Sequence, residues 1–384
     1  MGDGARKIGD GIHGTPTYDD NGEVAFINGN NLMNGEIAIT SQTKYVDDTQ
    51  KTAHDNNLNL DTILMSINGT IGNLAWYNGE NIMLGKSAAY IEVGDFDKAF
   101  MYILLQTNGV KKYFLDNLTG TTIKNLGLKT IRETPAKAPN RAEQAAIGSF
   151  FRTFDKLLTA TQRKVTGLKQ LKAAYLQQMF PQDGERVPRV RFEGFTADWA
   201  ETRLGDIADI VRGASPRPIQ DPKWFDESSD VGWLRISDVT EQDGRIRHLG
   251  QKISKAGQSK TRVLIEPHLL LSIAATVGKP VINYIKTGVH DGFLIFLNPQ
   301  FEHEFMFQWL EMFRTNWQQY GQPGSQVNLN SDLVKNQELC IPSRAEQVVI
   351  GGFFGNLDTQ IASQSEKLEQ LKQLKSAYLQ KMFI

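Results

Sequence analysis

Apolar side chains recur in alternating steps of four and three along two long stretches of the chain, residues 140–180 and 343–384. This spacing is the heptad pattern of helices that pack against one another. The first stretch carries the series Ile147, Phe151, Phe154, Leu158, Thr161, Val165, Leu168, Lys172, Tyr175 and Met179. The second carries Ile350, Phe354, Leu357, Ile361, Gln364, Leu368, Leu371, Lys375, Tyr378 and Met382, and a polar residue breaks each series at the same two steps.

Both stretches also begin with a helix-start signal. Asn140 and Ser343 are suitable N-caps, and a glutamate follows each of them three positions later, which is the spacing of a capping box. Pro181 ends the first stretch. A single amphipathic helix is as often an ordinary core helix, but two matched ones favour pairing. We predict that the two helices pair with each other as an antiparallel coiled coil.

The two stretches belong to an internal repeat. Residues 168–180 read LKQLKAAYLQQMF and residues 371–383 read LKQLKSAYLQKMF, so they differ at two of thirteen positions. Upstream, the tetrapeptide Arg-Ala-Glu-Gln starts at both Arg141 and Arg344. Each such helix follows a region whose two copies agree only at scattered positions. One part of the repeat therefore stayed fixed while the other diverged, which suggests identical partners on one surface and different targets on the other.

Each diverged region has a mixed α/β pattern. The predicted strands are 24–27, 62–67 and 88–93 in the first region, and 233–236, 269–273 and 292–297 in the second. A helix is predicted after the last strand of each region, over 95–107 and 302–314. We expect a first domain at 1–139, a first helix at 140–180, a linker at 181–195, a second domain at 196–342 and a second helix at 343–384.

Composition allows two ordinary globular domains. The chain has 384 residues, of which 40% are hydrophobic, and its formal net charge is −1. It contains no run of eighteen apolar residues and no signal peptide at its start, so a cytoplasmic protein without a membrane span is expected. The single cysteine, Cys340, lies in an apolar run and is expected to be buried and unreactive.

Several segments match an enzyme motif only in part. The segment from Gly9 to Gly14 satisfies GxGxxG, yet Pro16 follows at once and the strand and helix that such a loop requires are missing. The sequences NPQF at Asn298 and DPKW at Asp221 lack the second proline of an amino-methyltransferase loop. No GxxxxGK[ST] loop occurs, and the six histidines lack zinc-ligand spacing. We expect neither catalytic residues, nor a metal, nor a cofactor.

Polar residues at the predicted strand ends differ between the two copies. Ser66, Thr70 and Gly72 correspond to Ser272, Thr276 and Gly278, whereas three asparagines after the first strand fall opposite Arg235, Ser237 and Asp238. Such side chains suit the reading of base edges better than core packing, although solvated loops have the same composition. The base-contact candidates are Thr15, Asn28, Asn30, Asn31, Thr70, Thr122, Ser215, Arg217, Arg235, Ser237, Thr276, Gln326 and Asn328.

Positive charge is distributed unequally between the two halves. Residues 245–262 contain six basic side chains and no acidic one, which is a run that attracts phosphate groups. Basic runs are usually just solvated surface, so this feature supports the hypothesis only modestly. The phosphate-contact candidates are Lys111, Lys112 and Lys124 in the first half, and Arg245, Arg247, Lys252, Lys260 and Lys279 in the second.

The order of these segments resembles the specificity subunit of a type I restriction-modification system. The resemblance covers nearly the whole chain, through GDGIHGTPTYDDNGEVAFINGNNLMNGEI, RFEGFTADWAETRLGDIADIVRGASP and IPSRAEQ. One departure is that Arg191 to Thr202 precede the second Leu-Gly-Asp, whereas only Met1 to Arg6 precede the first copy. The resemblance implies a non-catalytic subunit that reads double-stranded DNA, one half-site per domain.

The resemblance also implies partners. Two adenine methyltransferase subunits would dock on the paired helices, and restriction subunits would join them to give a methyltransferase and an ATP-dependent endonuclease. The predicted helix-pair interface consists of Phe151, Phe154, Leu158, Val165, Leu168, Tyr175, Phe354, Leu357, Ile361, Leu368, Leu371 and Tyr378. The alternative is a coiled-coil scaffold protein that binds no nucleic acid.

Overall fold

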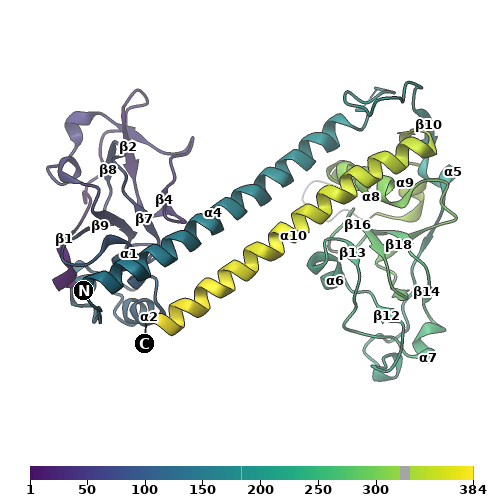
Figure 1. Ribbon diagram of the computed structural model, residues 1–384. Coiled ribbons are helices and arrows are strands. Elements are labelled where there is room, and N and C mark those ends of the chain that lie inside the picture. The colour runs from purple at the N-terminus through teal and green to yellow at the C-terminus, as the bar shows by residue number, and fades with distance from the viewer. Residues whose placement is uncertain (183, 321–328, 384) are drawn as a thin grey trace. The chain divides into compact units, whose positions relative to one another are not determined.

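The chain folds into two compact units in a computed structural model that describes residues 1–182, 184–320 and 329–383. The first unit comprises Met1–Lys164 and Gln364–Ile384, and the second comprises Val165–Ser363. There are two long helices, α4 (Arg141–Gln178) and α10 (Arg344–Met382) (Figure 1). Each of them has one segment in the first unit and one in the second. Each unit is therefore one α/β domain with a segment of each helix.

The first unit contains an antiparallel sheet that is buried on both faces. Its strand order is β1 (Ala5–Asp10), β9 (Ala88–Val93), β6 (Thr62–Ser66) and β7 (Leu74–Trp76). Because side chains alternate along a strand, Ile63 and Met65 of β6 join a core with the helices, whereas Leu64 joins a core on the other face. The helices before α4 are α1 (Lys98–Leu104), α2 (Asn108–Asp116) and α3 (Leu128–Glu133).

Shorter strands complete this unit. They are β5 (Tyr45–Val46), β2 (Val24–Ile27) and β8 (Ile82–Leu84) in one sheet, and β3 (Leu32–Met33) with β4 (Glu36–Ile37) in another. Residues of β2, β8 and β6 share the second core, so the short sheet packs against the face of the main sheet that is away from α1.

The second unit repeats this plan with longer sheets. The main sheet has the order β11 (Asp209–Arg212), β18 (Phe293–Leu297), β15 (Leu269–Ser272), β16 (Pro280–Asn283) and β13 (Arg245–Ile246). Leu269 and Leu271 of β15 face the core with the helices, and Leu270 faces the other core, as the period of two requires.

The remaining strands of the second unit are β12 (Gly232–Trp233), β17 (Thr287–Val289) and β14 (Arg262–Leu264) in one sheet, and β10 (Ala200–Arg203) paired with β19 (Glu338–Ile341). Its shorter helices are α5 (Leu204–Ile207), α6 (Ile236–Glu241), α7 (Lys255–Gln258), α8 (His303–Phe313) and α9 (Ser331–Lys335).

Matched glutamines fasten each domain to its long helix. The backbone N–H of Asp97, the N-cap of α1, donates to Gln144 Oε1 at 2.9 Å, and that of Glu302, the N-cap of α8, donates to Gln347 Oε1 at 2.8 Å. One turn further along, Gly148 and Gly351 allow close approach, because an added Cβ would lie 2.7 Å from the nearest atom at Gly148 and 2.6 Å at Gly351.

Within each unit the two long helices run antiparallel. In the first unit, Lys375 Nζ near the end of α10 lies 2.6 Å from Asp155 Oδ1 near the start of α4. In the second unit, Lys172 Nζ of α4 lies 2.6 Å from Asp358 Oδ1 of α10, so here α4 supplies the lysine and α10 the aspartate. The ring pairs Phe150–Tyr378 and Tyr175–Phe353 repeat the exchange, with centroids 5.1 and 5.2 Å apart.

The predicted fold class, two α/β domains with an internal repeat and two long antiparallel helices, is confirmed. The predicted helix-pair residues are buried or half-buried, except Tyr378, which is 36% exposed while its ring contacts Phe150. Asn140 Oδ1 and Ser343 Oγ accept from the backbone N–H of Glu143 and Glu346, as the capping prediction requires.

One predicted strand, 233–236, is wrong beyond its first residue. The chain leaves β12 at Trp233, and Asp238 Oδ2 accepts from the backbone N–H of Arg235, which starts α6 at Ile236. The other predicted strands occur within one residue of their expected bounds as β2, β6, β9, β15 and β18. None of the described helices has both the length and the apolar character of a membrane span.

Candidate nucleic-acid interface

Strand register gathers several loops at one edge of the first domain. Asp10 at the end of β1 pairs with Ala89, and Ser66 at the end of β6 pairs with Ala88, so both strands end where β9 begins. The parallel strands β2 and β8 end beside each other, since Ile27 pairs with Leu84. The loops that follow β1, β2 and β6 therefore share this edge.

Residues 84–88, called the central turn of the first domain, join these loops. The backbone N–H of Ile12 donates to Leu84 O at 2.9 Å, and that of Ile67 donates to Ser87 O at 3.0 Å. Ser87 Oγ accepts from the backbone N–H of Gly29 at 2.9 Å. The backbone N–H of Leu126 donates to Ile67 O at 2.8 Å, so the loop of residues 119–125 also lies at this edge.

Residues 289–293 form the equivalent central turn of the second domain. The backbone N–H of Ala214 donates to Val289 O at 3.0 Å, and that of Ile273 donates to Gly292 O at 2.9 Å. Thr261 Oγ1 donates to both Ala214 O and Val289 O, at 2.6 and 2.9 Å, which brings residues 260–262 to the same place. The two domains thus build one backbone arrangement from diverged sequences.

The predicted base-contact residues lie at these edges wherever the structure describes them. In the first domain they are Thr15, Asn28, Asn30, Asn31, Thr70 and Thr122, with the phosphate candidate Lys124 beside them. In the second they are Ser215, Arg217, Arg235, Ser237 and Thr276, with Lys260 next to Thr261. The predicted Gln326 and Asn328 lie outside the described residues.

Some of these side chains have their polar atoms engaged inside the domain. Asn31 Oδ1 accepts from Asn28 N–H at 3.0 Å and its amide donates to Ala38 O at 3.0 Å. Asn28 Oδ1 accepts from Ser87 Oγ at 2.9 Å. Arg235 is held by Asp238 at 2.8 Å. Asn28 and Asn31 therefore shape the loop, whereas Thr15, Asn30 and Thr70 are exposed and remain contact candidates.

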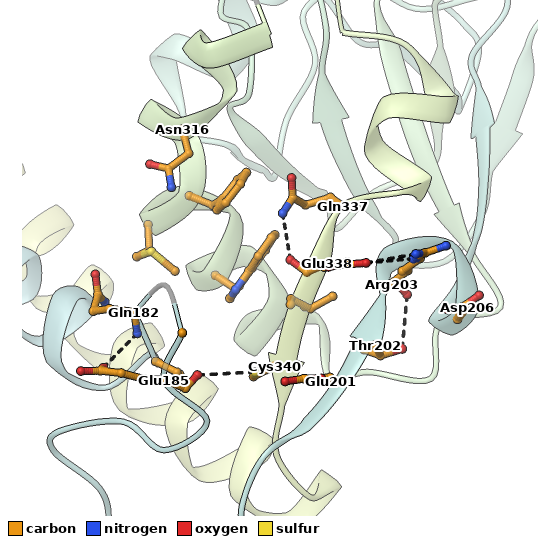
Figure 2. Close-up of a pocket in the computed structure, with 16 residues that line it drawn as sticks. Gln182, Glu185, Glu201, Thr202, Arg203, Asp206, Asn316, Gln337, Glu338 and Cys340 are labelled. Atoms are coloured by element: carbon orange, nitrogen blue, oxygen red, sulfur yellow. Dashed lines mark hydrogen bonds and ion pairs between the residues drawn. The ribbon is translucent and has the colours of Figure 1, made fainter.

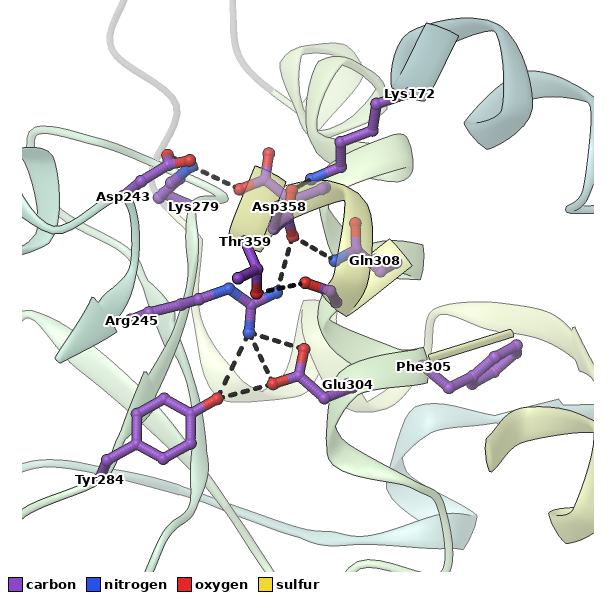
Figure 3. Close-up of polar contacts among 12 residues, drawn as sticks. Lys172, Asp243, Arg245, Lys279, Tyr284, Glu304, Phe305, Gln308, Asp358 and Thr359 are labelled. Atoms are coloured by element: carbon purple, nitrogen blue, oxygen red, sulfur yellow. Dashed lines mark hydrogen bonds and ion pairs between the residues drawn. The ribbon is translucent and has the colours of Figure 1, made fainter. Parts of the chain in front are cut away.

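The structure changes the role expected of Arg245 and Lys279. Arg245 contacts Glu304 at 2.6 Å and Asp358 at 2.7 Å, and its side chain is only 16% exposed (Figure 3). Lys279 contacts Asp243 and Glu311, each at 2.6 Å, and is 13% exposed. Arg245 of β13 thus contacts both α8 and α10, and Lys279, which directly precedes β16, contacts α8. These internal ion pairs occupy both cations and contradict their prediction as phosphate contacts.

Electrostatics keeps the Arg245 cluster charged. Burial by itself would lower the pKa of Arg245, but the carboxylates of Glu304 and Asp358 raise it above its ordinary value. Burial would raise the pKa of Asp358, but Lys172 and Arg245 hold it below its ordinary value. Burial and the hydrogen bond to Glu304 raise the pKa of Tyr284 to about 12.

The other basic candidates lie away from the central turns. Lys112 pairs with Asp116 on α2 at 2.8 Å, and Lys111 lines a cavity of about 540 Å³ beside the segments of α4 and α10 in its own unit. Arg247 stacks on the Tyr284 ring at 4.4 Å, and Lys252 forms a backbone bridge with Gly232. Their part in phosphate binding stays a prediction.

Four charged residues at the edges were missed by sequence reasoning. Lys86 is exposed in the first central turn, and Asp291 occupies the corresponding position of the second. Asp10 and Arg212 likewise end β1 and β11. Both pairs reverse charge between the copies. Strand register matches the first pair, because Ala88 and Phe293 pair with Ser66 and Ser272, the serines that end β6 and β15.

A cavity of the second unit lies away from the central turn. It has a volume of about 850 Å³ and is bordered by Pro181, Gln182, Gly184, Glu185, β10, β19 and the end of α8 (Figure 2). Two charged residues of its wall, Arg203 and Glu338, pair with each other at 3.0 Å. Burial raises the pKa of the Cys340 thiol in its wall, which keeps the thiol protonated at neutral pH. The described residues contain no group of three His, Cys, Asp or Glu side chains suited to a metal ion.

Comparison with protein families gives a match in both halves. The family described as the type I restriction modification DNA specificity domain matches residues 12–170 and 196–373. The type I restriction enzyme EcoBI specificity subunit of Escherichia coli is 23% identical over 235 residues, which are 56% of this chain and 48% of that protein. The chain therefore spans about half the length of this curated relative.

Solved structures share the fold. The S subunit of a type I restriction-modification system from M. genitalium superimposes with a TM-score of 0.65 at 16% identity, covering 98% of this chain and 93% of that one. A chain from a structure on complex assembly and conformational transition of the type I R-M system gives a TM-score of 0.54 at 15% identity, covering 100% and 96%.

Proposed function

Because the chain belongs to the type I restriction modification DNA specificity domain family, we propose that it reads an asymmetric, two-part DNA target, with one half-site contacted by each domain. The observation that carries this proposal is the pair of central turns. Each gathers diverged polar loops on a backbone arrangement that the domains share. A common scaffold with different side chains suits two different base sequences.

The test uses the complete complex, because the methylation readout needs the methyltransferase subunits. Profiling of methylated adenines in cells that carry the system should return one two-part motif. Filter binding of the same complex to mixed duplexes should show competition by that motif above random DNA. Equal retention of all duplexes would contradict the proposal, and no retention at low salt would favour the scaffold alternative.

The paired helices are the proposed dock for two copies of one methyltransferase subunit. Residues 168–180 and 371–383 keep identical side chains at exposed positions, including Leu171, 43% exposed, and Leu374, 45% exposed. Exposed positions elsewhere in the same helices have diverged, as Leu157 has from Gln360. Contacts within the chain do not require identical exposed residues, whereas two identical partners do.

This dock is defined as the exposed strip Lys169, Gln170, Leu171, Ala174 and Gln177 with its copy Lys372, Gln373, Leu374, Ala377 and Gln380. Native mass spectrometry should give two methyltransferase subunits per chain. Leu171→Glu and Leu374→Glu should each remove one of them, and the double variant both. Leu157→Glu, which changes an equally exposed leucine at 42% in a diverged segment, is the control and should keep both. A single subunit on the unaltered chain would contradict the model.

The chemistry of the complex is assigned to the partners. The chain would contribute recognition, while bound methyltransferase subunits modify adenine and restriction subunits supply ATP-dependent cleavage. We accordingly expect the isolated chain to show neither activity with S-adenosylmethionine nor with ATP, and activity of highly purified chain alone would refute this division.

A further inference from the structure

Asp291 in the second central turn organises the polar side chains around it. Its carboxylate accepts from Ser215 Oγ at 2.7 Å and from the terminal Nη2 of Arg217 at 2.6 Å. Its backbone carbonyl accepts from Arg212 Nε at 2.6 Å. A single turn residue thus holds three side chains that come from the end of β11 and the loop after it.

Arg217 is oriented without being covered. Its side chain is 74% exposed, and Asp291 uses one terminal nitrogen of a guanidinium that carries five N–H donors. Exposed ion pairs add little to stability, so folding alone gives no reason for this arrangement. A fixed guanidinium with free donors at a strand-end edge suits recognition of a flat partner with two acceptors.

We propose that Arg217 reads a guanine in the half-site of the second domain and that Asp291 is its positioning residue. This assignment rests on the proposed function. Arginine donates two parallel hydrogen bonds to O6 and N7 of guanine in the major groove, a pairing that no other base pair offers in the same form. Because Asp291 already holds the guanidinium in one orientation, binding costs less side-chain conformational entropy.

The first domain presents different chemistry on the same scaffold. Gly11 and Gly213 occupy equivalent places, because their backbone N–H groups donate to Ala88 O at 3.2 Å and to Phe293 O at 2.9 Å, at the ends of the two central turns. Around the first turn stand exposed Thr15 and Lys86 and the pair His13–Asp10 at 3.0 Å, where the second domain has Arg217, Asp291, Ser215 and Arg212. The position therefore changes with the half-site, as a reading position should.

The experiment measures binding of the complete complex to a duplex library randomised in each half-site. Arg217→Gln should lower discrimination at one guanine of one half-site by roughly 5- to 150-fold. Arg217→Lys keeps the charge but loses the fork, so it should relax the same position. Asp291→Asn should relax it less while the salt dependence stays unchanged. Arg203→Gln is the control, because Arg203 is also exposed, at 55%, and ion-paired in this domain.

Each other outcome overturns the assignment. Uniform weakening on all sequences with a shallower salt dependence would make Arg217 a phosphate contact. Relaxation at a base other than guanine, or no relaxation in either Arg217 variant, would remove it as the guanine reader. Failure of the proposed function is seen separately, as absence of any sequence preference in the unaltered complex.

Discussion

The two halves of this molecule agree where they meet the long helices and differ where their strands end. At the helices, Lys172 and Lys375 each pair with an aspartate of the other long helix at 2.6 Å. At the strand ends, the backbone hydrogen bonds are retained, but Lys86 of the first central turn is replaced by Asp291 in the second. The difference separates the surface proposed for assembly with identical partners from the surfaces proposed to contact two different half-sites.

The deepest shared contact should show the largest effect when it is removed. Phe180, fully buried, packs against Phe305 and Phe354, with ring centroids 5.4 and 6.1 Å away, and Phe383 packs against Phe100 and Phe151 in the same way at 5.6 and 6.3 Å. Phe180→Ala should destabilise the second unit by about 3–5 kcal/mol. Phe383→Ala should destabilise the first unit by less, since Phe383 is only half-buried.

Hydrogen exchange resolved by unit measures both effects. Each substitution should speed exchange mainly in the unit that contains the changed ring. Equal acceleration in both units for either variant would mean that the units do not unfold separately, and the comparison between the halves would lose its basis.

The close contact at the glycines should come next in size. Gly148→Ala and Gly351→Ala each place a methyl group within 2.9 Å of a backbone nitrogen, of Phe100 or Phe305, and overpacking of this kind costs about 1–3 kcal/mol. Gly167 and Gly352 have nothing within 4 Å of an added Cβ, so alanine there should instead stabilise by about 0.5–1 kcal/mol. Thermal unfolding of the four variants gives the test, and stabilisation by Gly148→Ala would contradict the close packing.

The helix and sheet core was predictable because its signal is periodic. The heptad series in α4 and α10 gave the buried positions from Ile147 onward, since burial repeats with helix geometry. The place of Arg245 was not predictable, because the carboxylates that bind it lie 59 and 113 residues away in the sequence. A run of charge in the sequence does not reveal which face of a strand each side chain occupies.

The residues at the strand-end edges were only partly predictable from the sequence. Thr276 was predicted from its place after the strand 269–273, whereas β1 and β11, which precede Thr15 and Arg217, were not predicted. Register explains why each of these loops lies beside the central turn of its own domain. Asp291 was missed because its importance lies in three contacts, made by residues that precede it by 79, 76 and 74 positions. Only the fold brings that loop to the central turn.

The two matched lysine–aspartate pairs between the long helices should differ in how much each lysine stabilises its unit. Lys172→Met leaves Asp358 with Arg245 at 2.7 Å and Gln308 at 2.8 Å, whereas Lys375→Met takes from Asp155 the ammonium group that pairs with it. We expect a loss of about 1–3 kcal/mol for Lys375→Met, since an unpaired charge is left half-buried, and a smaller loss for Lys172→Met. Urea unfolding of both, with exposed Lys169→Met as the control, tests this order, and the reverse order would refute it.

The smallest expected effect is a pH dependence confined to the second unit. Lys172 and Arg245 hold the pKa of Asp358 below its ordinary value despite burial, so the folded state binds a proton less readily than the unfolded state does. The stability from this group is fully present above the unfolded pKa of about 3.9 and is lost as the pH falls through the lower folded value. Hydrogen exchange in the second unit should therefore accelerate below about pH 4. Asp358→Asn should be less stable at neutral pH but should show a flatter decline over the acid range, because the titrating carboxyl is gone. An equally steep decline in that variant would assign the acid sensitivity to other carboxylates of the unit.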